Sequence, residues 1–133
     1  MARPIPPQTY YEAMGGAQTF AQIAHRFYEQ VAADPEFRAM YPEEDLGPAE
    51  DRLRMFLSQY WGGPTTYSDQ RGHPRLFLRH RPFPVTPTNR DIWVKYMTTS
   101  VNEVEMDEEL RGVLLEYLDR AATAMINTPD EAN

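Results

Sequence analysis

The chain has 133 residues, no cysteine and a formal net charge of −7. A chain of this length forms one ordinary domain, and without cysteine it can hold neither disulfides nor thiolate-bound metal or iron–sulfur centres. Its basic residues are scattered between acidic ones, which argues against a nucleic-acid surface or an anionic membrane as partner. No apolar run approaches the length of a membrane span, so we expect a soluble, cytoplasmic protein with a small ligand.

The proline-rich start predicts an extended or mobile arm over residues 1–9, and order is expected to begin near Tyr10. After two consecutive glycines, apolar residues recur at helical spacing and predict a helix over about 18–32 with one apolar stripe. A short helix over about 35–39 is expected next. It stops there because Pro42 pushes the residue before it out of the α region.

A further apolar stripe predicts a helix over about 48–61, and the glycines and proline of Gly62-Gly63-Pro64 end it. A loop of about ten residues is expected after this stop. A short helix then runs from Pro74, which suits a first helical position, to near His80.

Two more helices are expected in the C-terminal part of the chain. Thr88, with Asp91 three residues later, is compatible with a capping box at the start of the first. Asp107 caps the second, whose apolar residues keep helical register until a Thr-Pro pair ends it, and residues 130–133 form a flexible tail. Because no strand-like alternation occurs, the pattern predicts an all-α domain over 10–129 with roughly five or six helices.

The three histidines do not form a zinc site. His73 and His80 are seven residues apart, which in a continuous helix means roughly 10 Å of rise, whereas two ligands of one zinc lie closer together. His25 lies off the centre of its apolar stripe and is interpreted as a surface residue. Taken alone, His80 is a helix-terminal histidine that the helix dipole favours. A haem ligand is the alternative, because Leu76, Phe83 and a neighbouring arginine would supply the apolar contacts and the cation that a haem needs.

The chain resembles the group II truncated haemoglobins in residues 52–85, RLRMFLSQYWGGPTTYSDQRGHPRLFLRHRPFPV, and in the Asp91-x-Trp93 pair. Three further elements fall where that family places them: Gly15-Gly16, Phe27-Tyr28 and Tyr41-Pro42. The resemblance extends over residues 10–129, and the WGGP and RH elements together make it specific. It implies a truncated globin fold, a two-over-two helical sandwich around haem b, iron protoporphyrin IX.

The resemblance implies that His80 is the proximal ligand of the haem iron and that its other ring nitrogen is donated to a nearby acceptor. The other cofactor-binding residues that it implies are Arg79, Arg52 and Tyr67 near the haem propionates, with Leu76 and Phe83 against the macrocycle. Without the resemblance, either arginine is interpreted as part of a solvated helix face.

On the ligand side, the family places Tyr28, Tyr41 and Trp93 around the bound gas. Dioxygen on ferrous haem carries partial superoxide character, so hydrogen bonds from phenol and indole groups stabilise it in an apolar pocket, and slow release follows. Ala49 and Leu53 would face the ligand, and neither can donate a hydrogen bond. Without the resemblance, Tyr28 and Trp93 are interpreted as core aromatics of their helices.

The function that the resemblance implies is the binding of dioxygen, carbon monoxide and nitric oxide at a haem iron. Slow release makes bulk oxygen transport the less natural role. An alternative is a redox enzyme, either a nitric oxide dioxygenase or a haem peroxidase, which needs an external reductase because the sequence has no flavin motif. A second alternative is a haem-free helical interaction module. Assembly into a homo-oligomer is left open.

Overall fold

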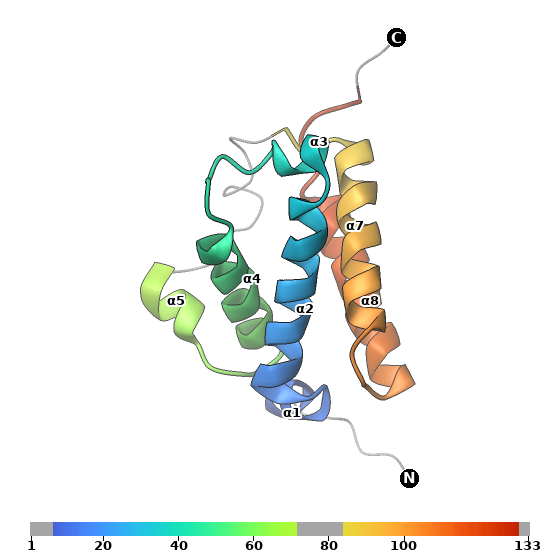
Figure 1. The fold of residues 1–133 in the computed structure, drawn as a ribbon. Coiled ribbons are helices and arrows are strands. Elements are labelled where there is room, and N and C mark those ends of the chain that lie inside the picture. Colours follow the sequence, from blue (N-terminus) through green and yellow to red (C-terminus); the bar gives the residue numbers. More distant parts are fainter. Residues whose placement is uncertain (1–6, 72–83, 131–133) are drawn as a thin grey trace.

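A computed structural model of the protein describes residues 7–71 and 84–130, and the regular elements within these two ranges are helices (Figure 1). Their bounds are α1 Pro7–Ala13, α2 Gly16–Ala32, α3 Pro35–Arg38, α4 Gly47–Tyr60, α5 Thr66–Arg71, α7 Pro87–Asn102 and α8 Glu108–Ala124. The all-α prediction is confirmed for this part of the chain. In the described ranges no helix is both long and apolar enough to cross a bilayer.

The side chains of two aspartates cap the N-termini of helices. Asp34 accepts a hydrogen bond of 3.2 Å from the backbone N–H of Phe37 at the start of α3. Asp107 accepts from the N–H groups of Glu109 and Leu110, at 3.1 and 3.3 Å, at the start of α8. Each such cap satisfies backbone donors that have no partner inside the helix. The prediction that Asp107 caps the last helix is therefore confirmed.

The N-terminal part of the chain contains two helices that the sequence pattern did not predict. α1 begins at Pro7, inside the expected arm, because a proline in the first turn loses no helical hydrogen bond. α5 lies within the segment that was expected to be a loop. The amide of Gln59 on α4 holds it, since its oxygen accepts from the backbone N–H of Ser68 at 2.9 Å and its nitrogen donates to the Ser68 hydroxyl at 2.7 Å.

The N-terminal cap of α7 differs from the predicted one. The hydroxyl of Thr86 accepts the backbone N–H of Asn89 at 3.0 Å, and Pro87 takes the first helical position of α7. Thr88 therefore lies inside the helix, and the capping box proposed for Thr88 with Asp91 is wrong.

The last helix ends at Ala124, before the Thr-Pro pair that was expected to end it. Backbone contacts with the segment before α7 explain the early end. The N–H groups of Asn127 and Thr128 both donate to the carbonyl of Val85, at 2.9 and 3.1 Å, and the Val85 N–H donates to the Asn127 side chain at 2.9 Å. These bonds draw the chain away from the helical path.

The four long helices form two pairs, α2 with α4 and α7 with α8, and α2 also packs against α7 (Figure 1). Residues at helical spacing on α2 supply much of the core: Phe20, Ile23, Ala24, Phe27 and Val31 are completely buried. This arrangement agrees with the two-over-two sandwich that the resemblance implies.

Two polar side chains fix how these helices meet. Gln30 of α2 donates to the carbonyl of Tyr96 and to the hydroxyl of Ser100 on α7, both at 3.0 Å. Arg111 of α8 donates to the carbonyl of Val101 in the last turn of α7 and to those of Val104 and Met106 in the segment after it. Two of these carbonyls lie beyond the last residue of α7, so Arg111 ties the segment between α7 and α8 to the start of α8.

Candidate functional site

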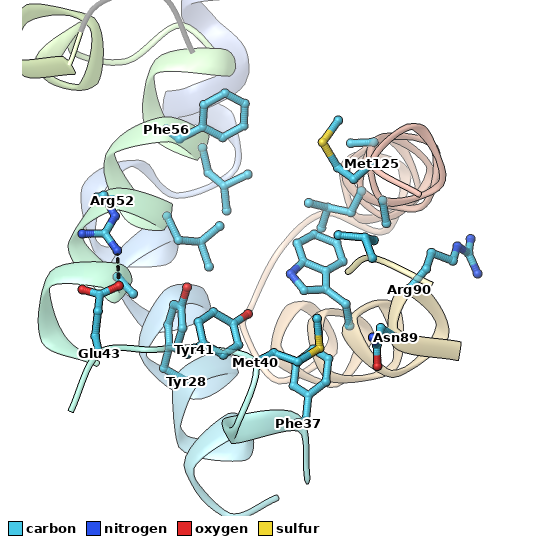
Figure 2. A pocket seen from close by; sticks show the side chains of 18 of the residues that line it. Tyr28, Phe37, Met40, Tyr41, Glu43, Arg52, Phe56, Asn89, Arg90 and Met125 are labelled. Atoms are coloured by element: carbon cyan, nitrogen blue, oxygen red, sulfur yellow. Dashed lines mark hydrogen bonds and ion pairs between the residues drawn. The ribbon is translucent and has the colours of Figure 1, made fainter. Parts of the chain in front are cut away.

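A cavity of about 400 Å³ lies between α4 on one side and α7 and α8 on the other (Figure 2). Cofactor pockets span about 300–1,000 Å³ and are mostly apolar, and this cavity meets both criteria. The described residues that line it are Tyr28, Phe37, Met40, Tyr41, Pro42, Glu43, Ala49, Arg52, Leu53, Phe56, Leu57, Tyr67, Val85, Asn89, Arg90, Trp93, Tyr117, Leu118, Ala121, Ala122 and Met125.

The predicted site residues that the structure describes all contribute to this one cavity. They are Tyr28, Tyr41, Ala49, Arg52, Leu53, Tyr67 and Trp93. The predicted residues Leu76, Arg79, His80 and Phe83, and also His73, lie outside the described residues. His25 is a surface residue, as predicted, with 64% of its side chain exposed and Glu50 at 3.3 Å.

Two helices provide apolar walls. On α4, Ala49, Leu53 and Phe56 are spaced by four and three residues, so they share one face, and Figure 2 shows Phe56 on the α4 side of the cavity. On the opposite side, Met125 closes the wall beside α8. The sequence predicted only that the apolar residues of α8 keep helical register, and it did not indicate which helix they face.

Two tyrosines from different segments place their hydroxyl groups toward the cavity. Tyr28 comes from α2 and Tyr41 from the segment after α3, and their rings meet edge to face with centroids 5.6 Å apart (Figure 2). Burial raises the pKa of Tyr28 to about 12 and raises the pKa of Tyr41 well above its ordinary value. Both phenols therefore remain protonated at neutral pH and can donate hydrogen bonds.

Trp93 of α7 is half-buried and lines the cavity opposite α4. Its indole packs against Phe27, with centroids 5.7 Å apart, and the same Phe27 ring meets Tyr28 edge to face at 4.9 Å. Phe27 therefore holds an indole donor and a phenol donor in fixed relation. In the sequence, Phe27 stands in an apolar stripe and in the Phe27-Tyr28 pair of the resemblance, and neither pattern indicates the contact with α7.

The polar groups of the cavity lie at its edge. Arg52 of α4 forms an ion pair of 2.5 Å with Glu43, and about a third of each side chain is exposed (Figure 2). Tyr67 of α5 is buried against Phe56, with centroids 5.8 Å apart. On the other side, Arg90 of α7 lies at the wall. Among residues 7–71 and 84–130 no cluster of three acidic or histidine side chains could hold a metal ion.

These residues fit a haem. The macrocycle needs a flat apolar slot, cations near its propionates and a controlled polar environment on the ligand side. The facing walls of α4 and α8 provide the slot, Arg52 provides a cation at the edge, and the two phenols with Trp93 provide donors.

Comparison with known proteins gives the same result. The family model described as bacterial-like globin matches residues 9–127. The group 2 truncated hemoglobin YjbI of Bacillus subtilis is 37% identical over 117 residues, which cover 88% of this chain and 87% of that protein. The crystal structure of a thermostable hemoglobin from Thermobifida fusca superposes with a TM-score of 0.89 at 56% identity, covering 91% of this chain and 98% of that one.

A truncated oxygen-avid haemoglobin from Bacillus subtilis superposes with a TM-score of 0.82 at 36% identity, covering 89% and 98% of the two chains. The fold and the cavity thus define a globin, a protein that holds haem and binds diatomic gases such as dioxygen. The chain belongs to the bacterial-like globin family, and within it to the group II truncated haemoglobins, with their two-over-two helical fold.

Proposed function

We propose that the protein binds dioxygen at haem b and releases it slowly, because Tyr28, Tyr41 and Trp93 donate hydrogen bonds to the bound gas. The observation that carries the proposal is that all three residues line one apolar cavity. Hydrogen bonds to an oxygen with partial negative charge are strong, and a medium of low dielectric strengthens them further. The oxygen-avid relative supports the same behaviour here.

The haem supplies, when bound, an iron with an open position for the gas. We assign His80 as its proximal ligand, with Leu76 and Phe83 against the macrocycle, as the resemblance implies. Arg52 would bind a haem propionate and would then divide its hydrogen bonds between the propionate and Glu43. Arg79 and Tyr67 would also contact the propionates. Ala49 and Leu53 exclude water from the gas without donating to it.

The experiment that tests this function is the visible absorption spectrum of the purified protein, first reduced and then exposed to carbon monoxide and to dioxygen. A haem band that shifts with each gas is expected. Dioxygen release, measured by rapid mixing, should be slow relative to release from a haem protein whose pocket has no hydrogen-bond donors. A colourless protein that also refuses added haem would contradict the proposal.

The second candidate function is a redox enzyme that uses an external reductase, either a nitric oxide dioxygenase or a haem peroxidase. The protonated state of both cavity phenols favours it, since donors that stabilise bound dioxygen also polarise an O–O bond. Steady turnover of nitric oxide or hydrogen peroxide well above that of free haem would identify this activity. A cytoplasmic location and a homo-oligomer also remain proposals from the sequence.

A further inference from the structure

The segment between α3 and α4, residues 39–46, carries one of the proposed donors but forms no helix or strand of its own. Tyr41 and Glu43 of this segment both line the cavity. Connecting segments are ordinarily more mobile than the elements that they join, because they lack the bonds of a helix or a sheet. A phenol on such a segment can donate steadily to a bound gas only if other contacts fix its backbone.

The side chain of Arg38, the last residue of α3, binds the backbone of this segment. Its Nη1 donates to the carbonyl of Tyr41 at 2.8 Å. Its Nη2 donates to the carbonyls of Glu43 and Glu44, the latter at 3.0 Å. The backbone N–H of Tyr41 in turn donates to the carbonyl of Arg38 at 3.0 Å. Arg38 therefore holds Tyr41 at both its N–H and its carbonyl.

A guanidinium suits this task because it presents several donors in a rigid planar fork, whereas the ammonium of lysine is a compact point charge on a flexible stem. Arg38 is not among the residues that line the cavity. It is therefore placed to act on the ligand side through the backbone of Tyr41, without touching a bound gas.

The ring of Tyr41 is held by aromatic contacts alone. Phe37, which precedes Arg38 on α3, is buried and meets the Tyr41 ring edge to face with centroids 6.0 Å apart. The ring of Tyr28 meets it from α2 at 5.6 Å, and Figure 2 shows the three rings side by side. Edge contacts limit the orientation of a ring. The position of the Tyr41 hydroxyl then depends on where Arg38 fixes the backbone.

We propose that Arg38 is a positioning residue for dioxygen binding, which keeps the hydroxyl of Tyr41 directed at the bound gas. The proposal rests on the proposed function, in which Tyr41 is one of the donors. Without the guanidinium, three carbonyls of the segment lose their donor, and the Tyr41 hydroxyl spends part of its time away from the gas. Dioxygen should then leave faster.

The test compares haem-loaded Arg38→Ala with the unmodified protein in two measurements, the rate of dioxygen release and the infrared stretching band of bound carbon monoxide. Release is expected to quicken roughly threefold to tenfold, as for the partial loss of one hydrogen bond. The carbon monoxide band responds to donors near the gas, so it should split, with one component at the position found in Tyr41→Phe. A lower stability of the fold alone would move neither reading.

A double variant shows whether Arg38 acts through Tyr41. If it does, Arg38→Ala combined with Tyr41→Phe should release dioxygen at the rate of Tyr41→Phe alone. Effects that simply multiply would overturn the proposal. Arg38→Lys keeps the charge without the fork and should still release dioxygen faster than the unmodified protein, and it serves as the test if Arg38→Ala does not fold. Full restoration by lysine would mean that charge, rather than positioning, is responsible.

The matched control is Arg26→Ala, since Arg26 pairs at 3.0 Å with Glu103 on the surface. It should leave the release rate and the carbon monoxide band unchanged. A Tyr41→Phe protein that releases dioxygen at the unmodified rate would overturn the donor role of Tyr41 in the proposed function, and this proposal with it. Faster release in Tyr41→Phe but not in Arg38→Ala would overturn the positioning role alone.

Discussion

Phe27 links the phenol of Tyr28 with the indole of Trp93. It is completely buried on α2, and the edges of its ring contact both Tyr28 and Trp93. Aromatic pairs of this geometry favour a narrow range of orientations. The positions of a phenol and an indole on two different helices therefore depend on one apolar side chain that does not itself line the cavity.

At Trp93, replacement by Phe is expected to accelerate dioxygen release, because it deletes an indole donor and keeps an aromatic ring against Phe27. A hydrogen bond to a charged group is worth about 1.5–3 kcal/mol, so release should quicken roughly tenfold to a hundredfold. Flash photolysis and rapid mixing measure the rate. Tyr96→Phe on the same helix lies outside the cavity and should leave release unchanged. Equal rates for the Trp93→Phe and unmodified proteins would mean that the tyrosines alone hold the gas.

For Tyr28, burial predicts a specific dependence of stability on pH. Its folded pKa, about 12, is raised above the ordinary value of 10.0, so its contribution is fully present below pH 10 and is lost as the pH rises toward 12. Two pKa units correspond to about 2–3 kcal/mol. Urea unfolding between pH 9 and 12 should therefore show a shallower loss of stability for Tyr28→Phe than for the unmodified protein. Parallel curves would show that Tyr28 ionises as easily in the folded state as in the unfolded one.

At the scale of elements, the turn between α7 and α8 depends on Arg111. Its guanidinium donates to three carbonyls, one in the last turn of α7 and two in the segment between α7 and α8. Arg111 also forms an ion pair with Glu108, but that carboxylate is exposed, so the pair adds little to the stability of the fold. The arginine therefore acts on the backbone of its neighbour helix rather than through its charge partner.

Replacing Arg111 with Ala should reduce the free energy of unfolding by about 1–3 kcal/mol, because three partly buried carbonyls lose their donor. Thermal or urea unfolding measures the change. Arg120→Ala, at an exposed position on the same helix, is the matched control and should stay within about 0.5 kcal/mol of the unmodified protein. If both variants lost the same stability, the carbonyl contacts of Arg111 would not contribute.

The long helices could be predicted from the sequence because each carries its own apolar stripe and stop. α2 and α4 begin and end within a residue or two of the expected positions. α5 could not be predicted from its own sequence, because the amide of Gln59 that holds it lies on another helix. At the start of α7 two threonines compete, and Pro87, which fits the first helical position after Thr86, was the signal that could have decided between them.

The candidate site, too, could be predicted from the sequence only in part. The resemblance, rather than spacing, brought Tyr28, Tyr41 and Trp93 together, and all three line one cavity. Contacts such as the stacking of Tyr60 on Tyr117 arise from segments far apart in sequence. No local pattern carries such pairings, because they are set only when the two helix pairs close on each other.

For the whole molecule, the two helix pairs enclose a cavity that a bound cofactor would fill. A ligand that binds only the folded state stabilises it by mass action. Adding haemin to the haem-free protein should therefore raise the midpoint of thermal unfolding, with an increase that grows with haemin concentration. Differential scanning fluorimetry checks this shift. A midpoint independent of haemin would contradict binding in the folded cavity.

Replacing His80 with Ala is expected to abolish stoichiometric haem binding, because it removes the proposed proximal ligand of the iron. Absorption titration with haemin measures the loss. His25→Ala is the matched control, since His25 lies at the surface, and it should bind haem fully. Tightly bound haem with an unchanged spectrum in His80→Ala would place the ligand at another residue.

The bonds between Val85 and the pair Asn127 and Thr128 join the segment after α8 to the segment that precedes α7. Chain ends usually fray, and their amide hydrogens exchange with water at nearly free rates. Here the amides of Asn127 and Thr128 are expected to be protected, and to exchange together with the first turn of α7. Unravelling from the C-terminal end therefore cannot proceed as an isolated event: it must open the wall of the cavity at the same time.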